Sequence, residues 1–177
     1  MKLGDSALVR RLARLALGGY FALALVLLVL LAGYRGQPPL SPAQPIAFPH
    51  TLHAGQLGLE CLFCHADAVR SPSATVPPLA TCMTCHETIA LDRPEVQKLR
   101  GYVERKEPVV WQRVHALPGF VRFTHQRHVK AGVDCAVCHG GVARMARVKR
   151  VRPLSMGWCL TCHLTKGAPT DCATCHV

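Results

Sequence analysis

The amino-acid sequence predicts a single N-terminal transmembrane helix followed by a small domain of short helices and mostly irregular connections. Three observations support this fold class. Twenty consecutive residues near the N-terminus carry no charge, all ten cysteines belong to five copies of one short motif, and the part that follows has only about 140 residues. With about 30 residues per motif, whatever the motifs bind must form most of the core.

The uncharged stretch covers residues 15–34 and is long enough to cross a bilayer as a helix. Four basic residues precede it (Lys2, Arg10, Arg11 and Arg14), whereas Arg35 is the only one that follows it closely. The positive-inside rule therefore predicts that residues 1–14 are cytoplasmic and that residues 36–177 lie outside the cytoplasm. A cleaved secretory signal is the alternative, but its apolar region is usually about 7–15 residues long. The pattern favours a retained anchor.

Residues 35–49 are rich in proline and nearly uncharged. Proline favours the extended polyproline II conformation, which makes a segment semi-rigid. The sequence therefore predicts a spacer between the membrane and the domain at residues 50–177.

Cys-x-x-Cys-His is the signature of c-type haem attachment, in which the thiols bond to the haem vinyl groups and the histidine ligates the iron. The chain carries it five times, and these copies are called motifs 1 to 5 in chain order. Their cysteines are Cys61, Cys64, Cys82, Cys85, Cys135, Cys138, Cys159, Cys162, Cys172 and Cys175, and their histidines are His65, His86, His139, His163 and His176. A zinc ribbon or a disulfide framework needs no histidine after each pair. The pattern predicts five covalently bound c-type haems.

Five histidines remain for five irons, each of which takes a sixth ligand. Four of them form two His-x-x-His pairs, His50 with His53 and His125 with His128. Residues three apart on a helical turn share one face, so the two rings of a pair cannot bracket one iron from opposite sides. Each pair is therefore expected to serve two different haems.

The pairs reveal an internal repeat. Phe48 precedes the first pair and Phe123 the second, and each pair is followed by two haem motifs. The sequence predicts two dihaem modules, at about residues 50–86 and 125–163, followed by a fifth haem at residues 172–176.

The sixth ligand of the fifth haem has two candidates. His115 is the remaining histidine, and Met156 precedes motif 4 in Met-Gly-Trp. A thioether ligand would raise the reduction potential relative to imidazole, which would suit an electron exit. Methionine also fills gaps in cores, so both assignments stay open.

The gap between motifs 2 and 3 contains one helix signal. Asp92 is a candidate N-cap, Pro94 and Glu95 suit a first turn, and Val96, Leu99 and Val103 follow at helical spacing, with Pro108 ending the helix. We expect this helix to serve packing or an interface.

The chain has a formal net charge of +11. Oxidised haems with ionised propionates carry about −1 each, which would leave roughly +6. Residues 144–152, RMARVKRVR, alternate basic and apolar side chains in a strand-like way. They could hold propionates, dock an acidic partner or lie near anionic lipid. No nucleic-acid-binding motif is present.

Together, the N-terminal anchor, the repeat, "VVWQRVHALPGFVRFTHQRHVKAGVDCAVCHG" and "MGWCLTCH" resemble the pentahaem (ActA-type) subunit of alternative complex III, a bacterial quinol-oxidising complex related through its haem motifs to class III multihaem cytochromes c. The resemblance implies an electron-transfer subunit in the bacterial inner membrane with its haem domain in the periplasm. It also implies an iron–sulfur subunit of molybdoenzyme type and integral membrane subunits as partners, and a monohaem cytochrome c or terminal oxidase as acceptor.

Three functions are compatible with five haems. The first is an electron wire with no catalytic residue. The second is a stand-alone membrane quinol dehydrogenase like the anchored NapC and NrfH cytochromes, which the lack of a carboxylate between Asp5 and Glu60 disfavours. The third is a multihaem reductase, which would need an open iron position, whereas five spare histidines match five haems. The sequence favours the wire, a part of an oxidoreductase complex that is not itself an enzyme.

Overall fold

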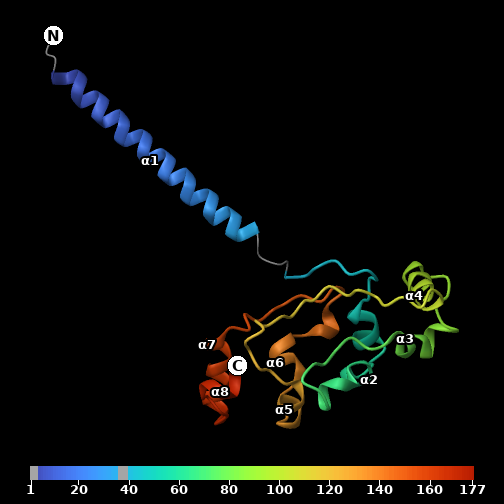
Figure 1. The fold of residues 1–177 in the computed structure, drawn as a ribbon. Coiled ribbons are helices and arrows are strands. Elements are labelled where there is room, and N and C mark those ends of the chain that lie inside the picture. Colours follow the sequence, from blue (N-terminus) through green and yellow to red (C-terminus); the bar gives the residue numbers. More distant parts are fainter. Residues whose placement is uncertain (1–3, 36–39) are drawn as a thin grey trace. The chain divides into compact units, whose positions relative to one another are not determined.

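The computed structural model describes residues 4–35 and 40–177 and divides the chain into two units, residues 1–39 and 40–177 (Figure 1). The second unit is built from short helical turns and irregular connections, as predicted. The elements in chain order are α1 (Gly4–Arg35), η1 (Thr51–Gln56), α2 (Cys61–Cys64), η2 (Ala66–Val69), α3 (Leu79–His86), α4 (Pro94–Glu104), α5 (His125–Lys130), α6 (Cys135–His139), η3 (Val142–Arg144), α7 (Met156–Lys166) and α8 (Cys172–Cys175).

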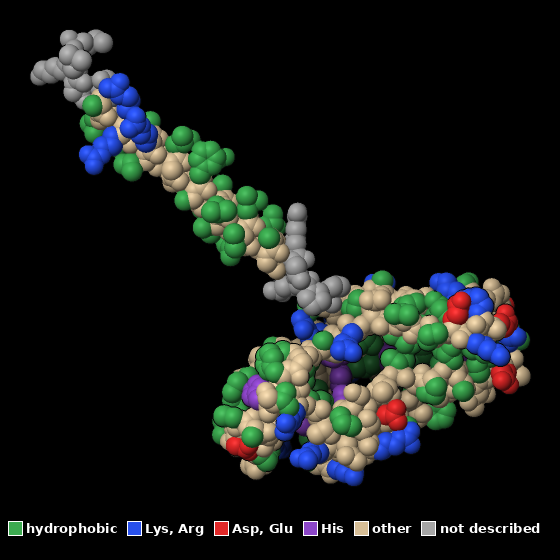
Figure 2. Space-filling model, viewed as in Figure 1, with side chains coloured by type: hydrophobic (Ala, Val, Ile, Leu, Met, Phe, Trp, Pro, Cys, Tyr) green, Lys and Arg blue, Asp and Glu red, His purple; other side chains and the backbone are tan. Residues whose placement is uncertain are grey.

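Within the described residues 4–35, the N-terminal unit is one long helix, α1. Its segment Ala7–Gly33, 27 residues with a mean hydropathy of 2.6, is long and apolar enough to cross a membrane. Apolar side chains cover it on all sides, and basic side chains gather toward its N-terminal end (Figure 2). The predicted helix at residues 15–34 is therefore present, and it extends further toward the N-terminus.

Part of the predicted spacer belongs to the second unit. Residues 36–39 lie outside the described residues, but the next ten lie along the domain. The Arg150 amide donates to the Leu40 carbonyl at 2.8 Å, and the Ser41 hydroxyl donates to the Val148 carbonyl at 3.0 Å. Ile46 is buried. The segment packs against the domain because its backbone and Ser41 form hydrogen bonds there and because the Ile46 side chain is removed from water.

Helix α4 confirms the helix predicted between motifs 2 and 3, but Asp92 is not its cap. The N-cap is Arg93, and Pro94 occupies the first position of the helix. Proline disfavours helical dihedrals in the residue before it, so the helix begins one residue later than the Asp92 assignment requires. The helix ends at Glu104, ahead of Pro108.

Few side chains are buried. Among the described residues the buried apolar side chains are Ile46, Ala68, Val96 and Leu99. No strand is present in the same residues, and the β-type pairing there is an isolated antiparallel bridge between Val121 and His176. The polypeptide alone therefore makes only a small core beside α4.

The strand-like pattern at residues 144–152 is not realised as a strand. Arg144 ends η3, and the following residues form irregular backbone. Their described partners at residues 40–41 give two hydrogen bonds, which is too short a ladder to make a sheet. Arg152 Nε donates to the Val137 carbonyl at 3.1 Å, so one basic side chain of this segment is held against α6.

The two predicted modules interlock. Helical turn η1 of the first packs against η3 of the second, and α5 of the second packs against η2 of the first. The first contact is close at Gly55, where an added Cβ would lie 2.5 Å from the Ala143 carbonyl oxygen. Glycine is required there because the two backbones approach each other directly.

Candidate haem-binding sites

Each Cys-x-x-Cys-His motif lies on or at the end of a short helix, namely α2, α3, α6, α7 and α8. Cysteines three apart then point to one side of a helical turn, which lets both thiols reach one ring system. Three of these helices are capped: Asp134 accepts from the Ala136 amide at 2.6 Å, Asp171 from the Thr174 amide at 2.9 Å, and Ser155 from the Trp158 amide at 3.4 Å. Side-chain caps make turns this short form in place.

Both His-x-x-His pairs adopt the same local geometry. The Phe48 ring stacks on His53 with 4.2 Å between centroids and meets His50 edge-on at 4.9 Å. Phe123 does the same in the second module, at 4.6 Å from His128 and 4.8 Å from His125. The sequence repeat contained these phenylalanines, but we did not assign them a role in the site. They set the orientation of the two imidazoles.

One ring nitrogen of most of these histidines is engaged by a backbone carbonyl. His53 Nδ1 lies 3.1 Å from the Pro49 carbonyl and His128 Nδ1 lies 2.9 Å from the Thr124 carbonyl, four residues back in each case. The same contact is made by His65 with Thr75, His86 with Ile89, His125 with Pro72 and His163 with Pro169, at 2.6–3.0 Å. A carbonyl that holds Nδ1–H leaves Nε2 as the metal-binding nitrogen. No sequence pattern predicted these carbonyl contacts.

Three histidine pairs from different segments face each other at nearly equal separations. The ring centroids of His53 and His86 are 6.2 Å apart, those of His128 and His163 are 6.1 Å apart, and those of His125 and His139 are 6.2 Å apart. An iron bound between two imidazoles at about 2 Å from each nitrogen places the centroids roughly 6 Å apart. These residues therefore fit a six-coordinate haem iron.

His50 belongs to the same arrangement. Burial, followed by the neighbouring rings of His65 and His53, lowers the pKa of His50, so His65 of motif 1 lies beside it. A lowered pKa keeps the imidazole neutral, which is the form that binds a metal.

His115 lies beside motif 3. Its ring meets that of His139 edge-on with 4.5 Å between centroids, and its Nε2 is buried without a hydrogen-bond partner. Burial, followed by Arg150 and His125, lowers the pKa of His115. The fifth motif has different surroundings, because the ring that stacks on His176 is that of Phe120 at 5.9 Å. Met156, the other candidate ligand, is 64% exposed at the start of α7.

His139 is the most perturbed histidine of the cluster. Burial and the rings of His115, His125 and His65 lower its pKa to about 4. Four imidazoles from motif 1, motif 3 and the segment between them thus gather in one place. On the face drawn in Figure 2, histidine side chains lie inside a hollow of the second unit.

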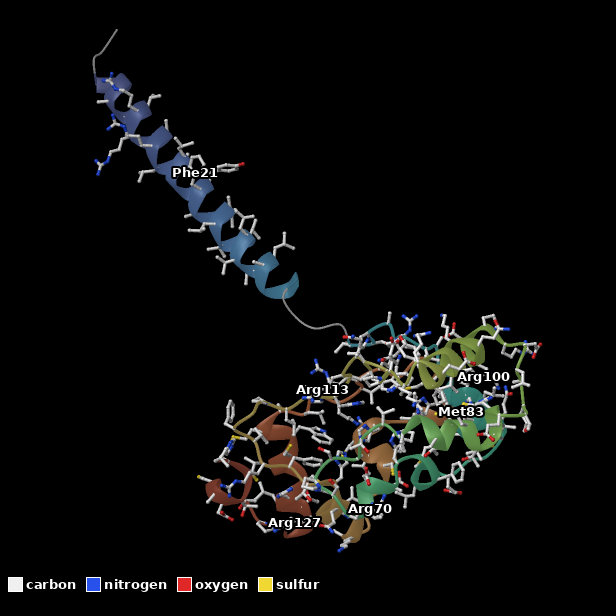
Figure 3. All side chains as sticks on the ribbon, turned by 45° about the vertical axis from the view of Figure 1, so that its right-hand side comes forward. Phe21, Arg70, Met83, Arg100, Arg113 and Arg127 are labelled. Atoms are coloured by element: carbon white, nitrogen blue, oxygen red, sulfur yellow. The ribbon has the colours of Figure 1, made fainter. Side chains whose placement is uncertain are left out.

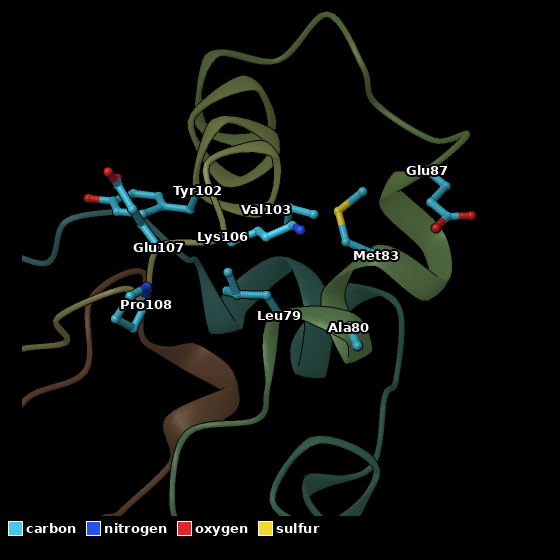
Figure 4. A pocket seen from close by; sticks show the side chains of 9 residues that line it. All are labelled: Leu79, Ala80, Met83, Glu87, Tyr102, Val103, Lys106, Glu107 and Pro108. Atoms are coloured by element: carbon cyan, nitrogen blue, oxygen red, sulfur yellow. The ribbon is translucent and has the colours of Figure 1, made fainter.

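A cavity lies away from the histidine cluster. It has a volume of about 550 Å³ and lies between α3 and α4, lined by Leu79, Met83, Tyr102 and Val103 among others (Figure 4). Cys82, Cys85 and His86 are not among the residues that line it. This cavity therefore lies beside motif 2 and not at its ligands.

Residues 121–177 match the family model described as cytochrome c7 and related cytochrome c. This C-terminal part of the chain is a cytochrome c domain of the multihaem type. Covalently bound c-type haems follow from that family, and the matched segment holds motifs 3, 4 and 5 together with the second histidine pair.

A curated relative extends the similarity. It is the menaquinone reductase, multihaem cytochrome c subunit, of Nitratidesulfovibrio vulgaris (strain Hildenborough), which is 33% identical over 97 residues. The aligned part is 54% of this cytochrome and 45% of the relative, so the chain spans under half the length of the curated protein that it matches.

Proposed function

We propose that this cytochrome is a membrane-anchored pentahaem electron carrier. It passes single electrons from a quinol-oxidising complex of the alternative complex III type toward a periplasmic cytochrome c or a terminal oxidase. The observation that carries the proposal is the set of facing imidazoles at 6.1–6.2 Å, which suits irons with both axial positions filled. Bound haem would supply reversible one-electron oxidation and reduction of iron.

The ten cysteines of the five motifs would hold the haems. The facing rings suggest that His53 serves the haem of motif 2, His125 that of motif 3 and His128 that of motif 4. The nearness of His65 to His50 suggests that His50 serves the haem of motif 1. His115 and Met156 remain the candidates for the iron of motif 5. The Arg150 side chain, which lies near His115, is placed to offset haem propionates in this region.

Filled axial positions leave no place for a substrate on the iron, so the cytochrome performs no bond-making chemistry of its own. Helix α1 would anchor it in the inner membrane with a cytoplasmic N-terminus and a periplasmic haem domain. The partners would be an iron–sulfur subunit of molybdoenzyme type and integral membrane subunits. The resemblance to the pentahaem subunit of alternative complex III supports this assembly.

A second candidate function reverses the direction of electron flow. The curated relative is named as a subunit of a menaquinone reductase, which delivers electrons to a quinone. A cytochrome with reversible one-electron centres can work in either direction, and the potentials of its partners decide which. A stand-alone quinol dehydrogenase is the third possibility, and it would have to bind the quinol itself.

A haem-stained native gel of membranes solubilised in mild detergent separates these functions. Proteins in the haem-positive band are identified by mass spectrometry, and the intact mass of the cytochrome gives its haem number. We expect five haems and a large assembly that contains an iron–sulfur subunit and polytopic membrane subunits.

The direction of electron flow is tested on the same assembly. Menaquinol or a reduced periplasmic donor is added, and haem reduction is followed. Rapid reduction by menaquinol supports quinol oxidation. A small lone species whose haems are reduced by quinol would reject the complex in favour of the stand-alone dehydrogenase.

A further inference from the structure

The five haem motifs do not succeed one another in space as they do along the chain. In Figure 1 the motif helices α7 and α8 lie together at one side of the second unit, and α6, α2 and α3 follow in that order. The view turned by 45° in Figure 3 likewise shows the red C-terminal helices at one side and α3, marked by Met83, at the other. Because α2 carries motif 1 and α3 carries motif 2, motif 1 lies between motif 2 and motif 3.

Motifs 1 and 3 are in direct contact. The Cys135 thiol lies near the Cys61 thiol. The backbone after motif 1 also receives the start of α5, since the His125 amide donates to the Pro72 carbonyl at 2.9 Å and the Gln126 amide donates to the Ser71 carbonyl at 3.2 Å. Fifty-odd residues of chain, motif 2 included, separate these partners in sequence.

Motif 2 adjoins motif 1 on the other side. The Cys82 thiol lies near Cys64, the second cysteine of motif 1. Beyond α3 comes α4, which carries no haem motif, and the cavity of about 550 Å³ separates parts of these two helices. Motif 2 therefore stands at one end of the series.

Motifs 3, 4 and 5 continue the series in the opposite direction. Cys138 of motif 3 lies near Cys162 and Cys159 of motif 4, and Cys159 lies near Cys175 of motif 5. The Arg152 guanidinium ties the segment before motif 4 to the Val137 carbonyl of motif 3. Motif 5 stands at the other end.

We propose that the haems form a single row in the order of motifs 2, 1, 3, 4 and 5, with the haems of motifs 2 and 5 as the two terminal electron-exchange sites. This order rests on the proposed haem at every motif and adds the route between them. Electron-transfer rates fall steeply with distance, so neighbours in the row exchange electrons directly. The haem of motif 1 becomes the required link between motif 2 and the rest.

Removal of one haem at a time tests the order. The double variant Cys61→Ala/Cys64→Ala lacks the haem of motif 1, and Cys82→Ala/Cys85→Ala lacks that of motif 2. A ferric low-spin haem with a ferric neighbour relaxes faster than an isolated one and gives broadened electron paramagnetic resonance lines. We expect the motif 1 variant to show one magnetically isolated haem out of four, and the motif 2 variant to show none.

A row of haems in the order of motifs 1, 2, 3, 4 and 5 would give the opposite result, because loss of the haem of motif 2 would then isolate the haem of motif 1. Two controls are common to both orders. Cys159→Ala/Cys162→Ala should isolate the haem of motif 5, whereas Cys172→Ala/Cys175→Ala should isolate none. Intact mass confirms that each variant carries four haems.

Iron positions in the unmodified holoprotein, located by anomalous scattering or electron cryomicroscopy, provide a test that needs no variant. The iron of motif 2 should have a single near neighbour, the iron of motif 1. Five irons in any other order overturn the row while leaving the electron carrier intact. Fewer than five irons would instead contradict the pentahaem proposal.

Discussion

At the scale of single residues, the histidines owe their orientation to backbone carbonyls and to two phenylalanine rings. A carbonyl fixes which ring nitrogen carries the proton, and a stacked Phe fixes the plane of the imidazole. His53 and His128 have both kinds of support. A rigid ligand lowers the reorganisation that accompanies each change of iron charge.

Replacement of one distal ligand should change the potential of one haem. In His128→Met a thioether would replace the imidazole that faces His163, and methionine ligation raises the reduction potential. We expect one of the five haems to shift upward by on the order of 100 mV, within the roughly 0.8 V that axial ligands span. A spectroelectrochemical titration measures it.

Arg127→Met is the matched control, because it introduces the same side chain on the same helix, α5, at an exposed position. It should leave all five potentials unchanged. An equal shift in both variants would show that the effect comes from any methionine introduced on α5 and not from iron ligation.

Asp67 links two segments near motif 1. Its carboxylate accepts from the Thr75 hydroxyl at 2.7 Å and from Arg70 Nε at 2.9 Å, and the hydrogen bonds from Thr75 and then Arg70 lower the pKa of Asp67. The Thr75 carbonyl in turn engages His65 Nδ1. A carboxyl whose native pKa lies below its unfolded value stabilises the fold above the unfolded pKa and loses that effect as the pH falls through the native pKa.

The thermal midpoint of Asp67→Asn should therefore be lower than that of the natural protein at neutral pH. The difference should shrink as the pH falls below about 4 through the native pKa, because both proteins are then uncharged at this position. Asp92→Asn, at an exposed site, is the control and should show no such difference. A gap that persists in acid would mean that the carboxylate charge is not the cause.

At the scale of elements, the two modules hold each other through η1 with η3 and α5 with η2. Gly55 marks the closest point, where a methyl group would meet the Ala143 carbonyl oxygen. Since backbone cannot move aside as a flexible side chain can, Gly55→Ala should destabilise the haem domain by about 1–3 kcal/mol. Chemical unfolding followed by circular dichroism measures the loss.

Gly157→Ala provides the comparison, because a Cβ at this position in α7 meets nothing within 4 Å. Alanine favours a helix over glycine by up to about 1 kcal/mol, so this variant should be as stable as the natural protein or more so. Equal destabilisation by both substitutions would contradict the close approach of η1 and η3.

Sequence patterns predicted the elements that depend on local signals. The long apolar run predicted α1, and the spacing of Val96 and Leu99 predicted the buried face of α4. Elements that depend on contacts with distant residues were harder to predict from the sequence. The sequence predicted a spacer up to residue 49 and a domain that begins at residue 50. In the structure, residues 40–41 already form hydrogen bonds with residues about a hundred positions further along the chain. The alternation at residues 144–152 predicted a strand for which the fold has no partner strand.

The candidate site shows the same division. The haem motifs and the histidine pairs can be predicted from the sequence because they are short and repeated. The position of His115 beside His139 is not, because it results from how a long irregular connection folds back. The spatial order of the motifs is hidden for the same reason, since it depends on the contact between modules.

At the scale of the whole molecule, four buried side chains among the described residues are too few to hold about 140 residues in one fold. Haem surfaces must replace the missing apolar core. We therefore expect the chain to be largely unfolded when it is produced without haem attachment. Circular dichroism and limited proteolysis of haem-free and haem-loaded preparations should differ sharply, with protection only in the loaded form.

The interlocked modules have a consequence for how the protein is made. An exported chain emerges with its N-terminal part first, so η1 and motif 1 reach the outside well before η3 and α5 have left the ribosome. Their packing partners are missing during that interval, and the first module stays open to the enzymes that join haem to its thiols. The contacts between the modules therefore leave an interval in which haem can be attached to the first half of the chain before the second half packs against it.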